Sequence, residues 1–336
     1  MLNFGIIGCG NIASVHAETL NQMPDAKLRA CCDIETSVGE NFAARYQCQF
    51  YQYYADLLID ERIDAVVIAT PHFLHHEMSL AALAANKHVL CEKPMAIKLE
   101  DAREINAAVQ KSKQIYHVCY QNRFNLAFVK LKKMLNENSF GSLHGVNCSL
   151  TWHRDNNYYS ANTWRGKWAT EGGGVLINQA IHSLDAICWL IGKPQRIKGT
   201  ILSSLLSELI EVEDAAIATA VLENGPPIVI SASNNYSTNP SPAIDFDFEG
   251  AAIRLTNESL IINEQEIVLD EPKATIAGKS YWGQGHPRLI RTFVNEITGQ
   301  TDELIPYLPR LDAIDSLALV CGIYQSHQTN QWVELV

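Results

Sequence analysis

A glycine-rich turn near the start of the chain constrains the fold more than any other feature. The apolar run Phe4–Ile7 leads into the motif GCGNIA at residues 8–13, and an amphipathic helix is predicted from about Ser14 to Met23. Strand, glycine turn and helix in this order, with alanine in the third position of G-x-G-x-x-G/A, are typical of a dinucleotide site. The glycines let the backbone approach a pyrophosphate, and the helix N-terminus offers free N–H groups and partial positive charge.

A second strand, predicted from Lys27 to Cys32, ends at Asp33. The acid lies about 20 residues beyond the turn, the interval at which a carboxylate reaches the adenosine ribose hydroxyls. A carboxylate there would repel a 2′-phosphate, so we predict NAD as the cofactor, with NADP disfavoured. An ordinary structural turn is the alternative, and the agreement of strand, helix and acid argues against it.

Strands and helices go on alternating through the first third of the chain. We predict helices at 39–46, 54–58 and 75–86, and strands at 63–69 and 87–91. Such alternation implies a parallel, doubly wound sheet whose ligand lies beyond the carboxyl ends of the strands. Asp33, Thr70, Pro71 and Lys93 all fall at such ends, which is why we treat them as one site.

The last of these strands ends in Glu92-Lys93-Pro94. Lysine is rarely buried unless paired, so a lysine at the mouth of a strand either reaches solvent or is held there for chemistry. The proline restricts the backbone of Lys93 and allows a cis Lys93–Pro94 bond.

His72, His75 and His76 have the spacing of one helical face, which invites a metal-site interpretation. No carboxylate or cysteine completes a convincing ligand set, so we predict no metal.

Composition narrows the possible partners. The chain has 336 residues, enough for two domains, with 47% hydrophobic and 19% charged residues and a net charge of −11. That charge disfavours nucleic acid and anionic membranes. No apolar run approaches the roughly 18 residues of a membrane span, and the N-terminus has no signal-peptide pattern. The nine cysteines show no zinc spacing and are interpreted as reduced thiols, so we expect a cytoplasmic protein.

Five stretches resemble one family, the glucose–fructose oxidoreductase / inositol dehydrogenase / MocA (Gfo/Idh/MocA) family. They are GCGNIA at 8–13, ATPHFLHHEM at 69–78, KHVLCEKPMA at 87–96, EGGGVLINQAIHSLD at 171–185 and WGQGHPRLIRTFVNEITG at 282–299. The resemblance implies a Rossmann domain followed by an α/β domain with a large open, mostly antiparallel sheet. It also implies NAD(P)-dependent chemistry at a sugar or cyclitol hydroxyl, with Lys93 and His182 in the catalytic positions.

The chain departs from the family pattern at Asn178, where the family usually has aspartate. The loss of that charge puts a proton relay through position 178 in doubt. The variant N-Q-x-I-H at 178–182 resembles the branch that oxidises the 3-hydroxyl of nucleotide-linked amino sugars, for which UDP-N-acetylglucosamine and its uronate are typical substrates.

For the rest of the chain we predict a second domain over residues 122–336, after a nucleotide domain over 1–121. A helix at 127–136 is followed by strand patterns at 143–152, 195–203, 213–222, 227–235, 243–248, 251–256 and 259–262. Their Gly, Asn and Pro turns predict a meandering antiparallel sheet. An exposed sheet face commonly finds a partner, so we expect a homodimer or homotetramer.

Between these strands lies an aromatic and basic loop that includes Tyr158, Tyr159, Trp164, Arg165 and Trp168. Aromatic rings stack on sugar faces and arginine binds anionic oxygens, so the loop suits a sugar or nucleotide-sugar substrate. A loop that merely covers the core is the alternative. The three glycines 172–174 allow unusual backbone angles or a close approach at the entry to the helix that carries His182.

Oxidation of an alcohol needs a base, a donor for the developing oxyanion, and a carbon that faces the nicotinamide. His182 suits the base, and Lys93 suits the oxyanion partner, or the base itself if burial lowers its pKa. Asn178 can bond a sugar hydroxyl, and Asp185 is placed to orient the imidazole. A histidine that merely fills the core is the alternative for His182.

The predicted site is therefore as follows. The catalytic residues are Lys93 and His182; the cofactor-binding residues are Gly8, Gly10, Asn11, Ile12, Asp33, Thr70, Pro71, His75, Glu92, Lys93, Gln121, Trp164 and Arg165; and the substrate-binding residues are Lys93, Arg123, Tyr159, Arg165, Asn178 and His182. The predicted activity is a nucleotide-sugar 3-dehydrogenase; a free-sugar, cyclitol or glycoside oxidoreductase and a non-catalytic dinucleotide-binding regulator are the alternatives.

Overall fold

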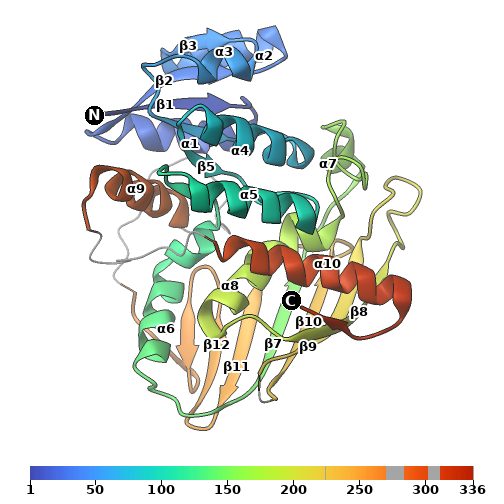
Figure 1. Cartoon of the computed structure of the whole chain (residues 1–336). Coiled ribbons are helices and arrows are strands. Elements are labelled where there is room, and N and C mark those ends of the chain that lie inside the picture. The colour runs from blue at the N-terminus through green and yellow to red at the C-terminus, as the bar shows by residue number, and fades with distance from the viewer. Residues whose placement is uncertain (224, 270–283, 302–310, 336) are drawn as a thin grey trace.

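The protein is built on two sheets of different construction (Figure 1). The computed structural model describes residues 1–223, 225–269, 284–301 and 311–335. The first sheet belongs to the N-terminal third of the chain, and the second lies below it in the view of Figure 1.

The first sheet has six parallel strands in the order β3-β2-β1-β4-β5-β6. Its elements are β1 (Leu2–Ile7), α1 (Asn11–Asn21), β2 (Ala26–Cys32), α2 (Thr36–Tyr46), β3 (Gln49–Tyr51), α3 (Tyr54–Leu58), β4 (Ala65–Ile68), η1 (His72–Leu74), α4 (His75–Ala84), β5 (His88–Cys91), α5 (Leu99–Lys111), β6 (Tyr116–Val118) and η2 (Gln121–Phe124). All four residues of β4 are buried, as expected of a strand with helices on both faces of the sheet. The strand order is that of a Rossmann fold, as predicted.

The second sheet has nine strands in the order β14-β13-β12-β11-β7-β10-β9-β8-β15. The elements of this part of the chain are α6 (Leu126–Asn136), β7 (Leu143–Thr151), α7 (Asn156–Ser160), η3 (Val175–Ala180), α8 (Ile181–Ile191), β8 (Arg196–Leu202), β9 (Ala215–Val221), β10 (Pro227–Ser233), β11 (Ala243–Phe248), β12 (Ala251–Leu255), β13 (Leu260–Ile262), β14 (Gln265–Glu266), α9 (Gly285–Thr298), α10 (Ala313–Thr329) and β15 (Val333–Glu334). The predicted simple meander is wrong in one respect: β7 pairs in parallel with β10. The sheet is otherwise antiparallel, as expected.

The long connection that follows β7 contains residues of the candidate site. The chain leaves β7, passes through α7, η3 and α8, and only then forms β8. This long connection contains the aromatic loop, the glycine run and His182, and it starts at the carboxyl end of β7.

Two C-terminal helices pack against the nucleotide domain, and one of them, α10, also contacts the second sheet (Figure 1). Helix α9 packs on α1, with Phe293 against Phe4 of β1 at a ring distance of 6.2 Å, so it belongs to the core of the nucleotide domain in space. Helix α10 contacts α5 of the first domain and α8 and β8 of the second. Both helices come after residue 121 in the sequence but contact elements that come before it. The domain bounds 1–121 and 122–336 therefore stay a prediction. The late helix of the family resemblance is α9; residues 282 and 283 of that stretch lie outside the described residues.

The expected elements are present with ends moved by up to three residues. The sequence interpretation missed β3, α5, β6, α7, α10, β14 and β15. Several of these are strands of two or three residues, too short to show an alternating pattern. Helix α5 does carry a helical signal, since Ala102, Ile105 and Val109 recur on its buried face.

Candidate active site

The glycine turn has the geometry of a dinucleotide site. Gly8 has φ of +93°, and a Cβ there would lie 2.6 Å from the carbonyl oxygen of Ala69 at the end of β4. A Cβ on Gly10 would meet nothing within 4 Å, and no side chain caps the N-terminus of α1. The turn and the helix end therefore have free N–H groups and open space, which fits a pyrophosphate.

Asp33 lies beside this turn. Its Oδ2 accepts the Cys9 backbone N–H at 2.9 Å and its Oδ1 accepts the Glu35 N–H at 2.9 Å. The two bonds hold the carboxylate at the carboxyl end of β2, in the position predicted for ribose recognition.

The segment after β4 connects the two domains. His72 Nδ1 lies 2.8 Å from the carbonyl oxygen of Glu171, and its ring lies 4.6 Å from the Trp164 ring. His75 is buried between carbonyl groups, with Nδ1 2.7 Å from Pro94 O and Nε2 2.9 Å from Thr70 O. The loop of the second domain thus lies over the strand ends of the first.

The three histidines that invited a metal interpretation do not converge. His76 Nε2 lies 3.0 Å from Glu104, away from the carbonyl partners of His72 and His75. A different buried group, His16, Glu92 and Cys119, has ligand atoms within 4.8 Å of one another. A His16–Glu92 contact of 2.7 Å already occupies it, and although burial acts to raise it, this contact lowers the pKa of Glu92 to about 2.

Lys93 of the first domain is hydrogen-bonded to a residue of the second domain. Its Nζ donates to the Asn178 backbone oxygen at 2.8 Å and to Asn178 Oδ1 at 3.0 Å. An ammonium has three donors, and the third has no acceptor among the described residues. Burial lowers the pKa of Lys93 to about 8, while Glu92 and Glu171 act to raise it. The Lys93–Pro94 bond is cis.

The backbone that receives Lys93 is unusual. Val175–Ala180 is a π-helix, a wide turn that frequently occurs at functional sites. Gly173 has φ of +149°, and a Cβ on Gly174 would lie 1.9 Å from the Glu213 carbonyl oxygen. The buried Glu213 carboxylate accepts the N–H groups of Gly174 and Leu176 at 2.8 and 3.0 Å. The glycine run therefore provides both an unusual backbone angle and a close approach, as expected.

A carboxylate that sequence reasoning missed lies behind Asn178. The buried Glu171 accepts the Asn178 Nδ2–H group through Oε1 and the Gly166 N–H at 2.5 Å through Oε2. Burial raises the pKa of Glu171 to about 6. Asn178 Nδ2 also donates to the Tyr158 hydroxyl at 3.2 Å. Position 178 itself thus carries no negative charge, but Asn178 is hydrogen-bonded to the carboxyl group of Glu171.

His182 carries a buried polar atom, Nδ1, without a hydrogen-bond partner among the described residues. Burial, and then the Lys93 charge, lower the pKa of His182 to about 3, so the imidazole is neutral near pH 7. Lys93 is thus one of the charges that act on the predicted catalytic imidazole.

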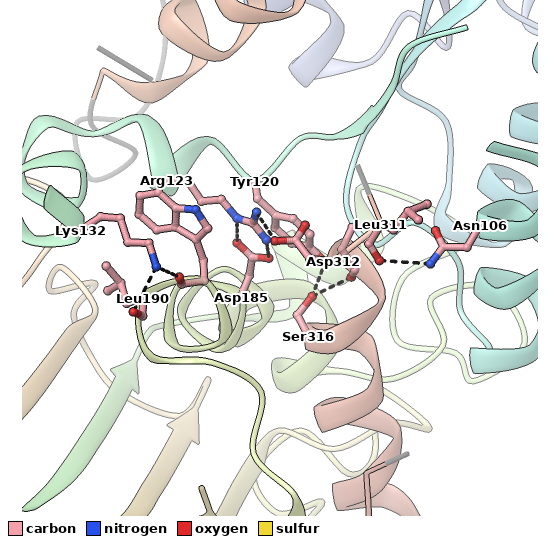
Figure 2. Close-up of polar contacts among 11 residues, drawn as sticks. Asn106, Tyr120, Arg123, Lys132, Asp185, Leu190, Leu311, Asp312 and Ser316 are labelled. Atoms are coloured by element: carbon pink, nitrogen blue, oxygen red, sulfur yellow. Dashed lines mark hydrogen bonds and ion pairs between the residues drawn. The ribbon is translucent and has the colours of Figure 1, made fainter. Parts of the chain in front are cut away.

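The expectation that Asp185 orients His182 is wrong. Asp185 accepts from Arg123 Nε at 2.7 Å and Nη2 at 2.5 Å, and Arg123 Nη1 donates to Asp312 at 2.8 Å (Figure 2). Residues three apart lie on one face of a helix, but the Arg123 guanidinium takes both carboxylate oxygens of Asp185, so this side chain is paired with Arg123 and is not bonded to the imidazole. Arg123, predicted to bind substrate, is 4% exposed and committed to this pair, so we do not carry it into the proposed site.

Some side chains of the aromatic loop face the candidate site, and others are buried in the core. Tyr158 faces Asn178, whereas Tyr159, the predicted substrate residue, is buried against Ile210 and Val212, with its hydroxyl accepting from Asn234 at 3.2 Å. The Arg165 guanidinium lies over the rings of Tyr158 and Trp164 at 4.4 and 5.2 Å. We therefore replace Tyr159 with Tyr158 in the site. Neighbouring tyrosines carry no sequence signal that tells which one points inward.

Family models match both parts of the chain. One described as "Oxidoreductase family, NAD-binding Rossmann fold" matches residues 2–120, and one described as "GFO/IDH/MocA C-terminal domain" matches residues 128–254. The chain belongs to the Gfo/Idh/MocA family of NAD-binding oxidoreductases.

Two curated relatives are likewise named an oxidoreductase and a dehydrogenase. The uncharacterized oxidoreductase YrbE of Bacillus subtilis is 30% identical over 68% of this chain and 66% of its own length. Inositol 2-dehydrogenase of Rubrobacter xylanophilus is 30% identical over 56% of this chain and 51% of its own length. The matched segment thus spans about half to two thirds of these curated relatives.

Two solved structures cover the whole chain. WlbA dehydrogenases of Chromobacterium violaceum and Bordetella pertussis, each in complex with NADH and UDP-GlcNAcA, superpose with a TM-score of 0.87 for both. They are 29% and 28% identical to this chain, over all of it and over 96% and 99% of their own chains.

No helix in the described residues combines the length and apolarity that a membrane crossing would need.

Proposed function

We propose that the protein is an NAD-dependent dehydrogenase that oxidises a secondary hydroxyl of a sugar, namely the 3-hydroxyl of a nucleotide-linked amino sugar such as UDP-N-acetylglucosamine or its uronate. The observation that carries the proposal is Lys93, held by two hydrogen bonds to Asn178 of the other domain, with no third acceptor among the described residues. The Lys93 charge also acts on the pKa of His182. The WlbA structures, which are complexes with a nucleotide-sugar, support the choice of substrate class.

Lys93 is the proposed base. A catalytic base works best when its pKa lies near the working pH, and burial brings that of Lys93 to about 8, whereas that of His182 falls to about 3. The substrate O–H proton would pass to the neutral Nζ of Lys93, and the neutral imidazole would hold the hydroxyl by a hydrogen bond. NAD, when bound, would supply the hydride acceptor. This reverses the first assignment of the two roles made from sequence.

Asn178 and Glu171 position this base. Since the Asn178 side chain joins Lys93 Nζ to the Glu171 carboxylate, the ammonium formed by proton transfer has a counter-charge without direct contact. Glu171 also acts to raise the pKa of Lys93 against its burial.

We expect Asp33→Ser to reduce the preference for NADH over NADPH by about tenfold to a hundredfold, because a charged hydrogen bond to the ribose contributes roughly 1.5–3 kcal/mol. The carboxylate beside Cys9 is the group that would repel a 2′-phosphate. Fluorescence titration with both reduced cofactors measures the ratio. Glu35→Ser, an exposed change two residues away, is the control. An unchanged ratio in Asp33→Ser contradicts the NAD assignment.

A free sugar or cyclitol is the second candidate, favoured by the match to inositol 2-dehydrogenase. The deciding experiment is NADH formation from NAD with UDP-N-acetylglucosaminuronate, UDP-N-acetylglucosamine, glucose, glucose 6-phosphate and myo-inositol. We expect the highest kcat/KM with a UDP-sugar. A higher value with glucose or inositol rejects the nucleotide-sugar assignment, and no turnover with any member of the panel rejects the dehydrogenase proposal as tested.

We also propose a cytoplasmic homodimer or homotetramer. The outward face of the second sheet exposes apolar side chains, with Ile217 57% and Val229 44% exposed. Such a face suits a symmetric contact between copies, and a strict monomer in light scattering at micromolar concentration contradicts it.

A further inference from the structure

Two arginines pack on one tyrosine beside the proposed catalytic residues. The Arg154 guanidinium lies 4.8 Å from the Tyr158 ring centroid, and that of Arg165 lies 4.4 Å from it. Arg154 also lies over Trp152 at 4.8 Å, and Arg165 over Trp164 at 5.2 Å. The two cations therefore share an aromatic support at the carboxyl end of β7.

Neither arginine has an acidic partner among the described residues. Arg154 is 9% exposed, and its Nη1 donates to the His153 carbonyl at 2.6 Å and to Asn239 Oδ1 at 2.8 Å. Arg165 donates to the Tyr158 carbonyl at 3.4 Å. The Nε atoms of both are buried without a partner. Buried arginine is ordinarily paired with an anion, and Arg154 has no such partner among the described residues, whereas the half-buried Arg165 acts on the pKa of Glu171 without a hydrogen bond to it.

The surroundings strengthen the argument. Lys93, Arg154 and Arg165 bring three positive charges to the site, and Arg165 acts on the pKa of Lys93. The nearby carboxylates already have other partners: Glu92 lies 2.7 Å from His16, Glu171 accepts from Asn178, and Asp155 accepts the Tyr158 N–H at 3.0 Å. Among the described residues none of the three is hydrogen-bonded to either arginine, so both guanidinium groups can still bind an anionic ligand.

The Tyr158 hydroxyl points to the same conclusion. It accepts N–H groups from Asn178 Nδ2 at 3.2 Å and Gln179 Nε2 at 3.1 Å. Burial raises the pKa of Tyr158, so the phenol keeps its proton, and no acceptor for that proton is found in the described part of the chain. An oxygen of a bound ligand would satisfy it.

We infer that Arg154, Arg165 and the Tyr158 hydroxyl form a subsite for an oxyanion of the substrate, a carboxylate or a phosphate. The inference rests on the proposed function, since it takes Lys93 as the group that meets the reacting hydroxyl. Asn178, which bonds both Lys93 and Tyr158, connects the two ends of the site. The subsite makes the acidic group of the substrate a determinant of specificity, separate from the hydroxyl that reacts.

The test measures ligand binding to the NADH complex of the full chain by isothermal calorimetry, so it needs no turnover. The ligands are UDP-N-acetylglucosaminuronate, UDP-N-acetylglucosamine, glucose 6-phosphate, glucuronate and glucose. Arg154→Met removes the charge and keeps much of the apolar stem, while Arg154→Lys keeps a charge. Arg196→Met is the matched control, because Arg196 is exposed and lies over Trp332 at 5.0 Å.

We expect Arg154→Met to raise the Kd of the anionic ligands about tenfold to a hundredfold, with the Kd values of glucose and NADH changed less than about twofold. Arg154→Lys is expected to recover part of the loss, and Arg196→Met to match the wild type. A loss confined to the two uronates identifies a carboxylate, and a loss shared by the phosphorylated ligands identifies a phosphate. Both support the subsite.

Three results overturn it: equal weakening of glucose and the anionic ligands, weakening of NADH as large as that of the anionic ligands, or no binding of any anionic ligand to the wild type. Failure of the proposed function looks different. In that case, anionic ligands would bind in an Arg154-dependent way but none would be oxidised.

Discussion

Replacing Lys93 with methionine is expected to lower kcat for sugar oxidation by a factor of about 10² to 10⁴, the usual contribution of a positioned base. NADH binding should change little, because Asp33 and the glycine turn lie on other strands of the sheet. The measurement is steady-state turnover alongside a fluorescence titration of NADH. Methionine retains the length of the side chain and removes the amine.

Two further variants test whether Lys93 acts as a base or only supplies a positive charge. Lys93→Arg keeps a positive charge that cannot be given up near neutral pH, so its turnover is expected to stay as low as that of Lys93→Met. Lys98→Met, an exposed lysine on the same segment, should retain wild-type turnover. Full activity in Lys93→Arg contradicts the role of Lys93 as base.

The pH dependence has a definite sign. Oxidation requires the neutral amine, so kcat/KM is expected to rise with pH and level off above the Lys93 pKa of about 8, and Lys93→Arg should lose that limb. The free energy of unfolding should also depend on the ionisation of Lys93. The folded pKa lies below the ordinary 10.5, so between pH 8 and 10.5 the unfolded chain binds more protons, and the wild type should gain stability relative to Lys93→Met across that window.

The second large effect concerns stability. We expect Asp185→Ala to lower the free energy of unfolding by about 3–5 kcal/mol, the range for removing one partner of a buried ion pair. Asp185 and Arg123 are 1% and 4% exposed, so among the described residues the remaining guanidinium would keep Asp312 alone as an ion-pair partner (Figure 2). Burial opposes the charge on Arg123, but the two carboxylates together raise its pKa above the ordinary value. Urea denaturation provides the measurement.

The control is Asp245→Ala, which removes an exposed partner of Arg254 and should cost less than about 1 kcal/mol. The double variant Arg123→Met/Asp185→Leu should recover most of the stability, since both buried charges are removed together. Folded Asp185→Ala should keep kcat within a few-fold, because Asp185 contacts Arg123 and not His182. A large loss of kcat at full stability would restore the orienting role.

This ion pair gives the domain junction its own polar core. Figure 2 shows Arg123 from η2 meeting Asp185 from α8 and Asp312 beside α10, with Tyr120 and Ser316 bonded at 2.7 Å nearby. Asn106 of α5 donates to the Leu311 carbonyl at 3.1 Å. The buried charges here pair with one another, whereas Lys93 is left for the proposed chemistry.

Local sequence was enough to predict the class of the nucleotide half of the protein and its central elements, although not β3, α5 and β6. The turn at residues 8–13, the acid at 33 and the strand that ends at Lys93 depend on contacts between neighbours in sequence or on one parallel sheet, and such contacts leave a periodic signal. The antiparallel class of the second sheet was also predictable. The parallel pairing of β7 with β10 was not, because it depends on where a long connection returns to the sheet.

The amino-acid sequence by itself determined the class of protein and was enough to propose Lys93 and His182 as its catalytic residues. Only the tertiary structure decided which charges face them. Arg123 and Asp185 pair with each other, Glu171 reaches Asn178, and Arg154 joins Arg165 on Tyr158. The physical reason is that burial and pairing set the state of each charge, and both depend on side chains brought together from distant parts of the chain.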